Sequence, residues 1–389
     1  MKVGIDDISF YTSNYYLDLR TLAEVHNIDV EKYYVGIGQE QMGMPAPDED
    51  VVTMGAAAAL PIVRQLEQPE SISTLLFATE SGIDQSKSAG VFAHQLLGLP
   101  ATCRVVELKQ ACYSATAAIQ MACALVARQP QQRVLVIASD IARYDLDSSG
   151  EPTQGCGAVA LLIAANPRLV EIEPLSGLHT EDVMDFWRPN YRSTALVDGK
   201  YSTKIYLKSL KSAWQHYRQQ GGRSLREFAF FCYHLPFTRM AQKAHAHLLK
   251  LESAELTAAE AEAQITDTLQ YNKRIGNSYT ASMYIGLASL LENAREDISE
   301  KLIGFFSYGS GCVAEFYAGR VVPGYQQWLR KHEHQQLLAN RQQVDYQTYR
   351  RLYAYPNPVD GQEHNIAAET TGPFRLAAIN QHKRIYQAV

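Results

Sequence analysis

The sequence predicts an α/β fold made of two related halves, and three observations support this prediction. Helical and β-type patterns alternate from residue 51 onward, which is typical of helices packed against a sheet. Several β-type runs, such as "RVLVIASD" and "GAVALLIAA", are apolar almost throughout, which predicts strands covered on both faces. A strand, a glycine-bearing turn and another strand occur in "VLVIASD…GAVALLIA" and again in "LIGFFSYGSGCVAEFYA". The second occurrence has the same order of elements as the first, but the two are not a clean sequence repeat.

The first half is predicted to close near residue 166. Its helical stretches are "VVTMGAAAALPIVRQL" from residue 51, "SAGVFAHQLLGL" from residue 88 and the Ala-rich stretch that follows Cys112. Its β-type stretches are "STLLFATE" from residue 73, "RVVEL" from residue 104, "RVLVIASDIARY" from residue 133 and "GAVALLIAA" from residue 157. The order of these stretches is that of helices alternating with strands of one sheet.

The second half is predicted to cover residues 167–389, after a first half of residues 1–166. Its helical stretches begin at residues 203, 239 and 280, and its β-type stretches are "FAFFCYHLP" from residue 228 and "LIGFFSYGSGCVAEFYAG" from residue 302. After about residue 324 the chain becomes polar and rich in Gln, Arg and Tyr. We predict a peripheral tail there, without a chemical role.

Composition excludes several classes of protein. The 36 basic and 41 acidic side chains give a formal net charge of -5, which is too balanced to predict a nucleic-acid partner. The N-terminal "MKVGIDDISFY" lacks the features of a signal peptide, and no apolar run reaches the roughly 18 residues of a membrane span. We therefore expect a cytoplasmic protein without a membrane partner. The six cysteines are predicted to be reduced thiols, and the absence of C-x-x-C spacing argues against a structural metal.

Cys112 lies between a β-type run and a helical run. The small residues after it, with Ser114 and Thr116, allow a helix to begin there. The N-terminus of a helix stabilises negative charge, so this position favours a thiolate and offers backbone N–H groups to an oxyanion. A packed cysteine without a chemical role explains the same spacing equally well.

Eight motifs along the chain point to one family. They are "GIGQEQM", "ATESGIDQSKS", "ELKQACYSAT", "GEPTQGCGAVA", "DFWRP", "YHLPFTRM", "GNSYTASMY" and "SYGSGCVAEF". In this order, from about residue 3 to 330, they resemble motifs of bacterial 3-hydroxy-3-methylglutaryl-CoA (HMG-CoA) synthases. The resemblance implies a thiolase-like five-layer α/β/α/β/α fold of two similar halves. It also implies the condensation of acetyl-CoA with acetoacetyl-CoA in the mevalonate pathway.

The resemblance assigns catalytic roles to three residues. Cys112 in "QACYSAT" matches the acylated nucleophile, Glu80 in "ATESGID" matches the general acid/base, and His234 in "YHLPF" matches the catalytic histidine. Carbon–carbon bond formation needs a base to remove a methyl proton, and an apolar pocket raises the pKa of a carboxyl group toward that task. Without the resemblance, Glu80 would be interpreted as a solvated residue at the end of a strand. His234 would be interpreted as a polar side chain whose hydrogen bonds are satisfied.

The resemblance further implies a set of substrate-binding residues. They are Asn277, Ser310, Tyr144, Arg239 and Lys243. Arg239 and Lys243 stand four residues apart on one predicted helical face and are our expected contacts to the phosphates of coenzyme A. The nearby Asp84 is expected to cap the helix that follows it. The implied reaction needs no metal or redox cofactor, and the family is dimeric.

Three alternatives remain open at this point. An initiating ketoacyl-carrier-protein synthase would use Cys112, His234 and Asn277 without needing Glu80. A β-branching synthase of a polyketide pathway would take its acyl groups from carrier proteins. A binding protein could retain the fold without catalysis, although all three catalytic residue types are present.

Overall fold

The computed structural model describes residues 1–389 and contains one large mixed sheet. Its nine strands are β1 (Val3–Thr12), β4 (Ile72–Ala78), β5 (Arg104–Leu108), β6 (Arg133–Ala142), β7 (Gly155–Ala165), β8 (Val170–Thr180), β11 (Phe228–Tyr233), β12 (Leu302–Gly309) and β13 (Val313–Val321). They lie in the order β11-β12-β13-β8-β1-β7-β6-β4-β5. Strands β1 and β8 pair only at Gly4 and Ile5, so this short ladder joins two half-sheets.

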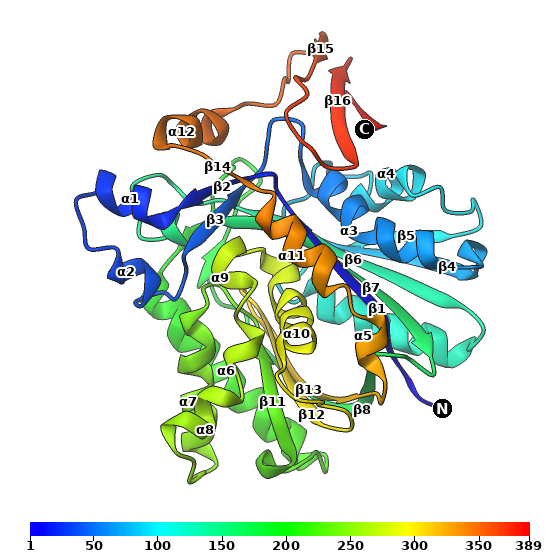
Figure 1. The fold of residues 1–389 in the computed structure, drawn as a ribbon, viewed down its shortest axis with the longest axis vertical. Helices are drawn as coiled ribbons and strands as arrows, with labels where there is room; N and C mark the ends of the chain where they lie inside the picture. The colour runs from blue at the N-terminus through cyan, green and yellow to red at the C-terminus, as the bar shows by residue number, and fades with distance from the viewer.

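Helices cover both faces of each half-sheet, which gives five layers (Figure 1). The helices of this core are α3 (Val51–Gln65), α4 (Ala89–Leu96), α5 (Ser114–Arg128), α6 (Gly199–Gln219), α7 (Arg239–Leu251) and α10 (Ser282–Asn293). Helices α3 and α4 pack on the outer face of the first half-sheet, and α6 and α7 pack on the second. Helices α5 and α10 fill the layer between them, as the predicted five-layer fold requires.

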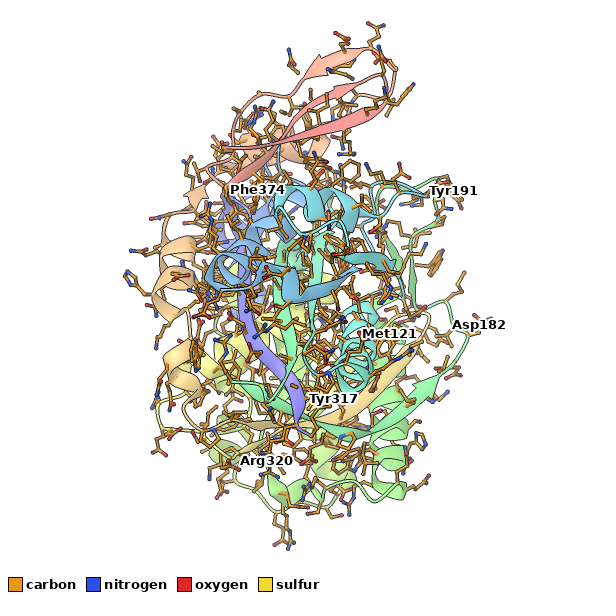
Figure 2. The ribbon with its side chains drawn as sticks, turned by 90° about the vertical axis from the view of Figure 1, so that its right-hand side faces the viewer. Met121, Asp182, Tyr191, Tyr317, Arg320 and Phe374 are labelled. Carbon is orange, nitrogen blue, oxygen red and sulfur yellow. The ribbon has the colours of Figure 1, made fainter.

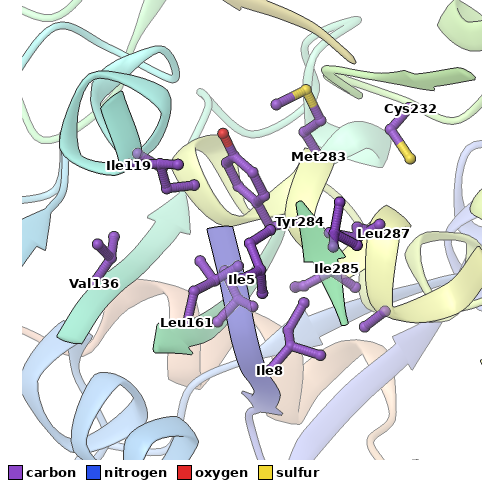
Figure 3. Packing of buried hydrophobic residues seen from close by; sticks show 14 of the residues in the cluster. Ile5, Ile8, Ile119, Val136, Leu161, Cys232, Met283, Tyr284, Ile285 and Leu287 are labelled. Atoms are coloured by element: carbon purple, nitrogen blue, oxygen red, sulfur yellow. The ribbon is translucent and has the colours of Figure 1, made fainter. Parts of the chain in front are cut away.

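Helix α10 of the central layer is buried along almost its whole length. All residues of α10 from Ser282 to Glu292 are buried, which agrees with a helix that is enclosed by other layers. Figure 3 shows Ile119 of α5 and Tyr284, Ile285 and Leu287 of α10 in one cluster with residues of β1 and β7. The Thr116 hydroxyl lies 2.7 Å from the Tyr284 hydroxyl and links the two helices.

The sequence patterns did not reveal β1 and β8, which join the halves. In β1, Asp6 and Asp7 interrupt the apolar pattern, yet both carboxylates are buried. Arg168 binds the Asp6 carboxylate at 2.9 and 2.7 Å, while buried Arg330 binds Asp7 through both of its terminal nitrogens. Because their charges are paired, these acids are compatible with a central strand. Strand β8 contains charged residues, Pro174 and Gly177, which hide its β-type pattern.

The C-terminal segment differs from the predicted peripheral tail. Its elements are α11 (Lys331–Ala339), β14 (Gln342–Gln343), α12 (Tyr346–Ala354), β15 (Glu363–Asn365), β16 (Phe374–Asn380) and β17 (Lys383–Ala388). Helix α11 packs on β1, where buried His334 stacks on Phe10 with ring centres 4.1 Å apart and lies 2.7 Å from Glu292. Its polar residues enter the core because buried partners satisfy them. Only the small β15–β17 sheet projects from the body, with Phe374 at its base (Figure 2).

Short elements complete the chain. They are α1 (Leu19–Val25), α2 (Glu31–Tyr34), α8 (Ala258–Ala263), α9 (Asn272–Ile275), β2 (Tyr15–Asp18), β3 (Gln41–Met44), β9 (Phe186–Trp187) and β10 (Leu196–Val197). None of the helices combines the length and apolar character needed to cross a bilayer. All six cysteines are free thiols, as predicted.

Candidate active site

Cys112 occupies the turn that leads into α5, where the sequence predicted it. The preceding Ala111 has a positive φ of 44°, and the Ser114 hydroxyl donates to the Ala111 carbonyl oxygen at 2.8 Å. A non-glycine residue in this region is uncommon and marks a turn that its surroundings hold in place. The thiol therefore has a fixed position at the start of the helix.

Glu80 follows β4 and lies beside the thiol. Its Oε1 accepts a hydrogen bond from Cys112 Sγ at 3.5 Å. Asp140, on the neighbouring parallel strand β6, holds the backbone of this segment: its Oδ1 accepts from the N–H groups of Glu80 and Ser81, both at 2.9 Å. Asp84 does not cap α4 as expected, because it accepts from the N–H groups of a local turn, whereas Ser88 caps the helix.

The pKa values of Cys112 and Glu80 do not support the thiolate that the helix position favours. Desolvation, and then the charges of Glu80 and Asp140, raise the pKa of Cys112 well above its ordinary value. Desolvation and the charge of Asp140 also raise the pKa of Glu80 to about 8, although Arg188 opposes this shift. Burial and neighbouring acids outweigh the helix N-terminus, so both groups are mainly neutral at pH 7. Burial and these acids therefore disfavour the thiolate that the helix position was expected to favour.

His234 follows β11 and is buried. Its Nδ1 lies 3.0 Å from the hydroxyl of Ser282, the first residue of α10. The same hydroxyl oxygen accepts from the Leu235 N–H at 3.3 Å, which leaves its proton for Nδ1. Desolvation lowers the pKa of His234 to about 3, so the imidazole is neutral. This arrangement favours the tautomer that carries its proton on Nε2.

One cavity of about 140 Å³ brings together five of the predicted residues, namely Cys112, His234, Asn277, Ser310 and Tyr144. Aromatic side chains form much of its wall, including Tyr206, whose hydroxyl donates to the His234 carbonyl oxygen at 2.9 Å. Glu80 lines a neighbouring groove of about 1180 Å³ that runs beside β5. Ser310 lines both spaces, so the Cys112–Glu80 contact lies at their boundary.

Asn277 and the loop at Ser310 supply hydrogen-bonding groups to the cavity. The Asn277 Oδ1 accepts from the Tyr279 N–H at 2.8 Å, and its Nδ2 donates to no protein atom. Gly309 approaches the nucleophile turn so closely that an added Cβ would lie 2.7 Å from the Tyr113 nitrogen. Only glycine permits this approach, which brings the Ser310 loop against the residues flanking the thiol.

Arg239 and Lys243 are not part of the cavity wall. Both are exposed on α7, and the Lys243 Nζ lies 5.2 Å from the ring centre of Phe237, which does line the cavity. Arg188, in contrast, reaches the site: its guanidinium donates to the Glu80 carbonyl oxygen. The motif "DFWRP" contains Arg188 and was the sequence signal that could have identified it. Ser282 carried no such signal.

One group of possible metal ligands lies outside this site. Ligand atoms of His26, Asp147 and Glu151 lie within 4.8 Å of one another. The Glu151 carboxylate already accepts from the Tyr349 hydroxyl at 2.7 Å and from the Asp147 N–H at 2.6 Å. Internal hydrogen bonds therefore account for the position of this carboxylate.

Comparisons with known proteins give a consistent result. Models of the N-terminal and C-terminal parts of hydroxymethylglutaryl-coenzyme A synthase match residues 1–168 and residues 170–255 and 247–357. A hydroxymethylglutaryl-CoA synthase of Enterococcus faecalis is 40% identical over 390 residues, with 100% of both chains covered. A polyketide biosynthesis 3-hydroxy-3-methylglutaryl-ACP synthase of Bacillus subtilis is 34% identical over 91% of this chain and 88% of its own. The crystal structure of an HMG-CoA synthase complexed with CoA superposes with a TM-score of 0.95, at 38% identity and 100% coverage of both chains.

Proposed function

The chain belongs to the hydroxymethylglutaryl-coenzyme A synthase family, and we propose that it condenses acetyl-CoA with acetoacetyl-CoA and water to give HMG-CoA and free CoA. Members of this family are acyl-condensing transferases, and the fold is thiolase-like. The contact between Cys112 and Glu80, beside His234, carries the proposal because it joins a nucleophile to a base.

In the first stage, Cys112 takes the acetyl group. Its sulfur bonds to the acetyl carbon, the thioester bond of acetyl-CoA breaks, and CoA leaves as a thiol with the proton that Cys112 gives up. Transfer between two thioesters is nearly isoenergetic, so the cysteine keeps the acetyl group reactive. Backbone N–H groups at Cys112 and in the Ser310 loop stabilise the tetrahedral oxyanion in this proposal. The close approach of Gly309 to Tyr113 supports this role, because it brings the two segments together.

In the second stage, Glu80 removes a proton from the acetyl methyl group. The resulting enolate carbon attacks the β-carbonyl carbon of acetoacetyl-CoA, and the proton on Glu80 passes to the new alkoxide. The neutral His234 Nε2–H and the free Asn277 Nδ2 are the donors to that carbonyl oxygen. A carboxyl group with a pKa of about 8 can serve as both base and acid near neutral pH.

In the third stage, water attacks the thioester that links the product to Cys112. The carbon–sulfur bond breaks and HMG-CoA leaves with a new carboxylate. One proton of the water returns to Cys112, and the other passes to solvent. Each step balances with the three substrates alone, so the proposed mechanism requires no redox cofactor and invokes no metal. A place in the mevalonate pathway is consistent with this product.

Two alternative functions differ from HMG-CoA synthesis in the residues or the substrates that they require. A ketoacyl synthase of the initiating kind does not need a carboxylate beside the thiol, so the Glu80 contact argues against it. The second alternative is a synthase that takes its acyl groups from carrier proteins, because the Bacillus subtilis relative is named for an ACP product. The higher identity to the Enterococcus protein favours free CoA thioesters.

The test supplies acetyl and acetoacetyl groups either on CoA or on a phosphopantetheinylated carrier protein. We expect HMG-CoA, identified by mass, from the CoA thioesters at a higher kcat/KM than the carrier-bound product. A clear preference for carrier-bound groups would instead assign the chain to the polyketide type. No condensation in either form would indicate a binding protein.

A homodimer and a cytoplasmic location also remain predictions. Strand β5 is an unpaired sheet edge, and exposed Val106 and Met184 border the groove that contains Glu80. A second copy pairing along this edge would cover the groove and exclude water from the condensation step. Figure 2 shows Asp182, which lines this groove, and Tyr191 on the same side of the molecule. Sedimentation velocity measures the expected dimer directly.

A further inference from the structure

A buried carboxyl group on β13 holds the start of α5, the helix that follows Cys112. Glu315 is only 2% exposed and lies in the second half of the molecule. Its Oε2 accepts a hydrogen bond from the Tyr113 hydroxyl at 2.7 Å, and its Oε1 accepts one from Gln120 Nε2, also at 2.7 Å. Because Tyr113 and Gln120 are seven residues apart, they share one face of the helix. One carboxyl group therefore fixes two turns of α5 from the opposite half.

Glu315 belongs to the hairpin that carries the Ser310 loop. In this hairpin Gly309 of β12 pairs with Val313 of β13, and Glu315 follows Val313 by two residues. Paired residues, and residues two apart on one strand, share a face of the sheet, so Gly309 and Glu315 lie on the same face. This face lies against Tyr113, because an added Cβ at Gly309 would come within 2.7 Å of the Tyr113 nitrogen.

A third contact joins the same two segments. Gln110 Nε2 donates to the Ser310 carbonyl oxygen at 3.3 Å. Gln110 precedes Cys112 and Tyr113 follows it, so the hairpin holds the nucleophile turn on both sides. In the proposed acetyl transfer, N–H groups of the turn and of the loop share one oxyanion. The distance between the two segments therefore bears on the rate of that step.

The side chains of Glu315, Tyr113 and Gln120 line neither the active-site cavity nor the groove beside it. Glu315 can therefore act only through the turn, not on a substrate. Desolvation raises the pKa of Glu315, and its hydrogen bonds, that from Tyr113 foremost, oppose this shift. Burying a carboxyl group is unfavourable, and an apolar side chain would fill the same place if packing were the only requirement.

We propose that Glu315 is a positioning residue for the acetylation of Cys112. Through Tyr113 and Gln120 it fixes the start of α5 against the Ser310 loop, and with it the spacing of the N–H groups that share the oxyanion. This role rests on the proposed acetyl transfer and adds a residue from outside the cavity. Because Glu315 does not touch the substrate, it affects the rate of acetyl transfer and not the affinity for CoA.

The first test measures single-turnover acetylation at saturating acetyl-CoA, together with the affinity for CoA. Glu315→Leu leaves the Tyr113 hydroxyl without its acceptor, so it should acetylate about 10-fold more slowly with unchanged CoA affinity. Tyr113→Phe should show a similar loss, and the double variant should lose no more than Glu315→Leu, because both changes break the same bond. Glu315→Gln should keep the wild-type rate, since its amide oxygen accepts from Tyr113 and the Gln120 amide can turn over to accept from its nitrogen.

Tyr317→Phe is the matched control, because it also removes a buried polar group of β13. The Tyr317 hydroxyl lies 2.9 Å from the Tyr284 hydroxyl, so its loss should lower Tm and leave acetylation unchanged. Wild-type acetylation rates in Glu315→Leu and Tyr113→Phe would overturn the positioning role. A loss of CoA affinity in place of rate would do the same.

The second test needs no catalysis and uses hydrogen exchange. The Tyr113 N–H donates to the Gln110 carbonyl oxygen at 3.2 Å, so the protection of this amide reports on the turn. A peptide covering residues 110–116 should exchange about 10-fold faster in Glu315→Leu than in wild type, and at the wild-type rate in Tyr317→Phe. Equal exchange in Glu315→Leu and wild type would overturn the role. If wild type were not acetylated, the proposed function would fail, and exchange would still decide whether Glu315 holds the turn.

Discussion

At the scale of single residues, desolvation sets the resting state of the site. It is the largest influence on the pKa values of Cys112, Glu80 and His234, raising the first two and lowering the third. Each group is therefore neutral in its main form at pH 7. This arrangement avoids placing two negative charges 3.5 Å apart before substrate arrives.

Replacing Glu80 by Ala should separate acetylation from condensation. Acetylation should persist, because the charge of Glu80 raises the pKa of the Cys112 thiol and its loss makes that thiol more acidic. Condensation should fall by roughly 10²-fold or more, since no base remains for the methyl proton. Radiolabelled acetyl transfer and single-turnover HMG-CoA formation measure the two steps. If both steps fell equally, Glu80 would act on the thiol or the fold instead.

The pH dependence of condensation should report the raised pKa of Glu80. Because the carboxylate is the active base, the rate from preformed acetyl-enzyme should rise with pH and level off above about 8. Arg188 lowers this pKa, so Arg188→Gln should move the midpoint to higher pH. Single-turnover rates between pH 6 and 10 provide the measurement. A midpoint unchanged by the substitution would show that another group controls the profile.

At the scale of elements, the site forms where strands end. Glu80 and His234 follow β4 and β11 within two residues, while Asp140 lies near the carboxyl end of β6. Ligands of open α/β sheets bind outside the carboxyl ends of the strands, which explains why strand-end polar residues were informative in the sequence. The roles of Ser282 and Gly309 depend on contacts between distant elements and left no local pattern.

Replacing His234 by Ala should weaken acetoacetyl-CoA binding and spare acetylation. The recorded contacts link Cys112 to Glu80 and His234 to Ser282, so the imidazole is not the partner of the thiol. Losing one hydrogen bond to a buried carbonyl oxygen should weaken affinity about 10- to 100-fold. Burst acetylation rates and acetoacetyl-CoA affinity, measured on the same variant, decide the role. Abolished acetylation with unchanged affinity would make His234 the base for the thiol.

Replacing Gly309 by Ala should disturb the nucleophile turn. The new methyl group would lie 2.4 Å from the Gln110 carbonyl oxygen, so the two segments must separate. A shift of this size should slow acetylation about 10- to 100-fold. Gly304→Ala is the matched control: it lies in the same strand but meets the Phe231 ring at 2.7 Å, so it should lower Tm and leave the acetylation of folded protein intact. Equal loss of acetylation in both would point to general strain.

At the scale of the whole molecule, the residue patterns predicted many of the core helices and strands but not the strands that connect the two halves, and the five layers came from the family resemblance. Helices α3, α5, α6, α7 and α10 and the apolar strands follow the expected stretches, because each stretch has either an apolar face at helical spacing or a continuous apolar run. Strand β1 and the buried part of the C-terminal segment were not predicted, because their buried charged side chains are paired with partners far along the chain. Strand β8 was not predicted, because charged residues, Pro174 and Gly177 interrupt its β-type pattern. The site residues came largely from the family motifs, since spacing alone left Cys112, Glu80 and His234 with ordinary structural explanations.

The most direct test of the proposed mechanism is the mass of the whole protein after mixing with acetyl-CoA. We expect one acetyl group per chain, located on Cys112 by peptide mapping, and its conversion to HMG-CoA when acetoacetyl-CoA is added. Cys112→Ser should carry no label, and replacing the other five cysteines should leave labelling unchanged. Label on another residue, or HMG-CoA formed by Cys112→Ser, would contradict the assignment of Cys112 as the acyl carrier.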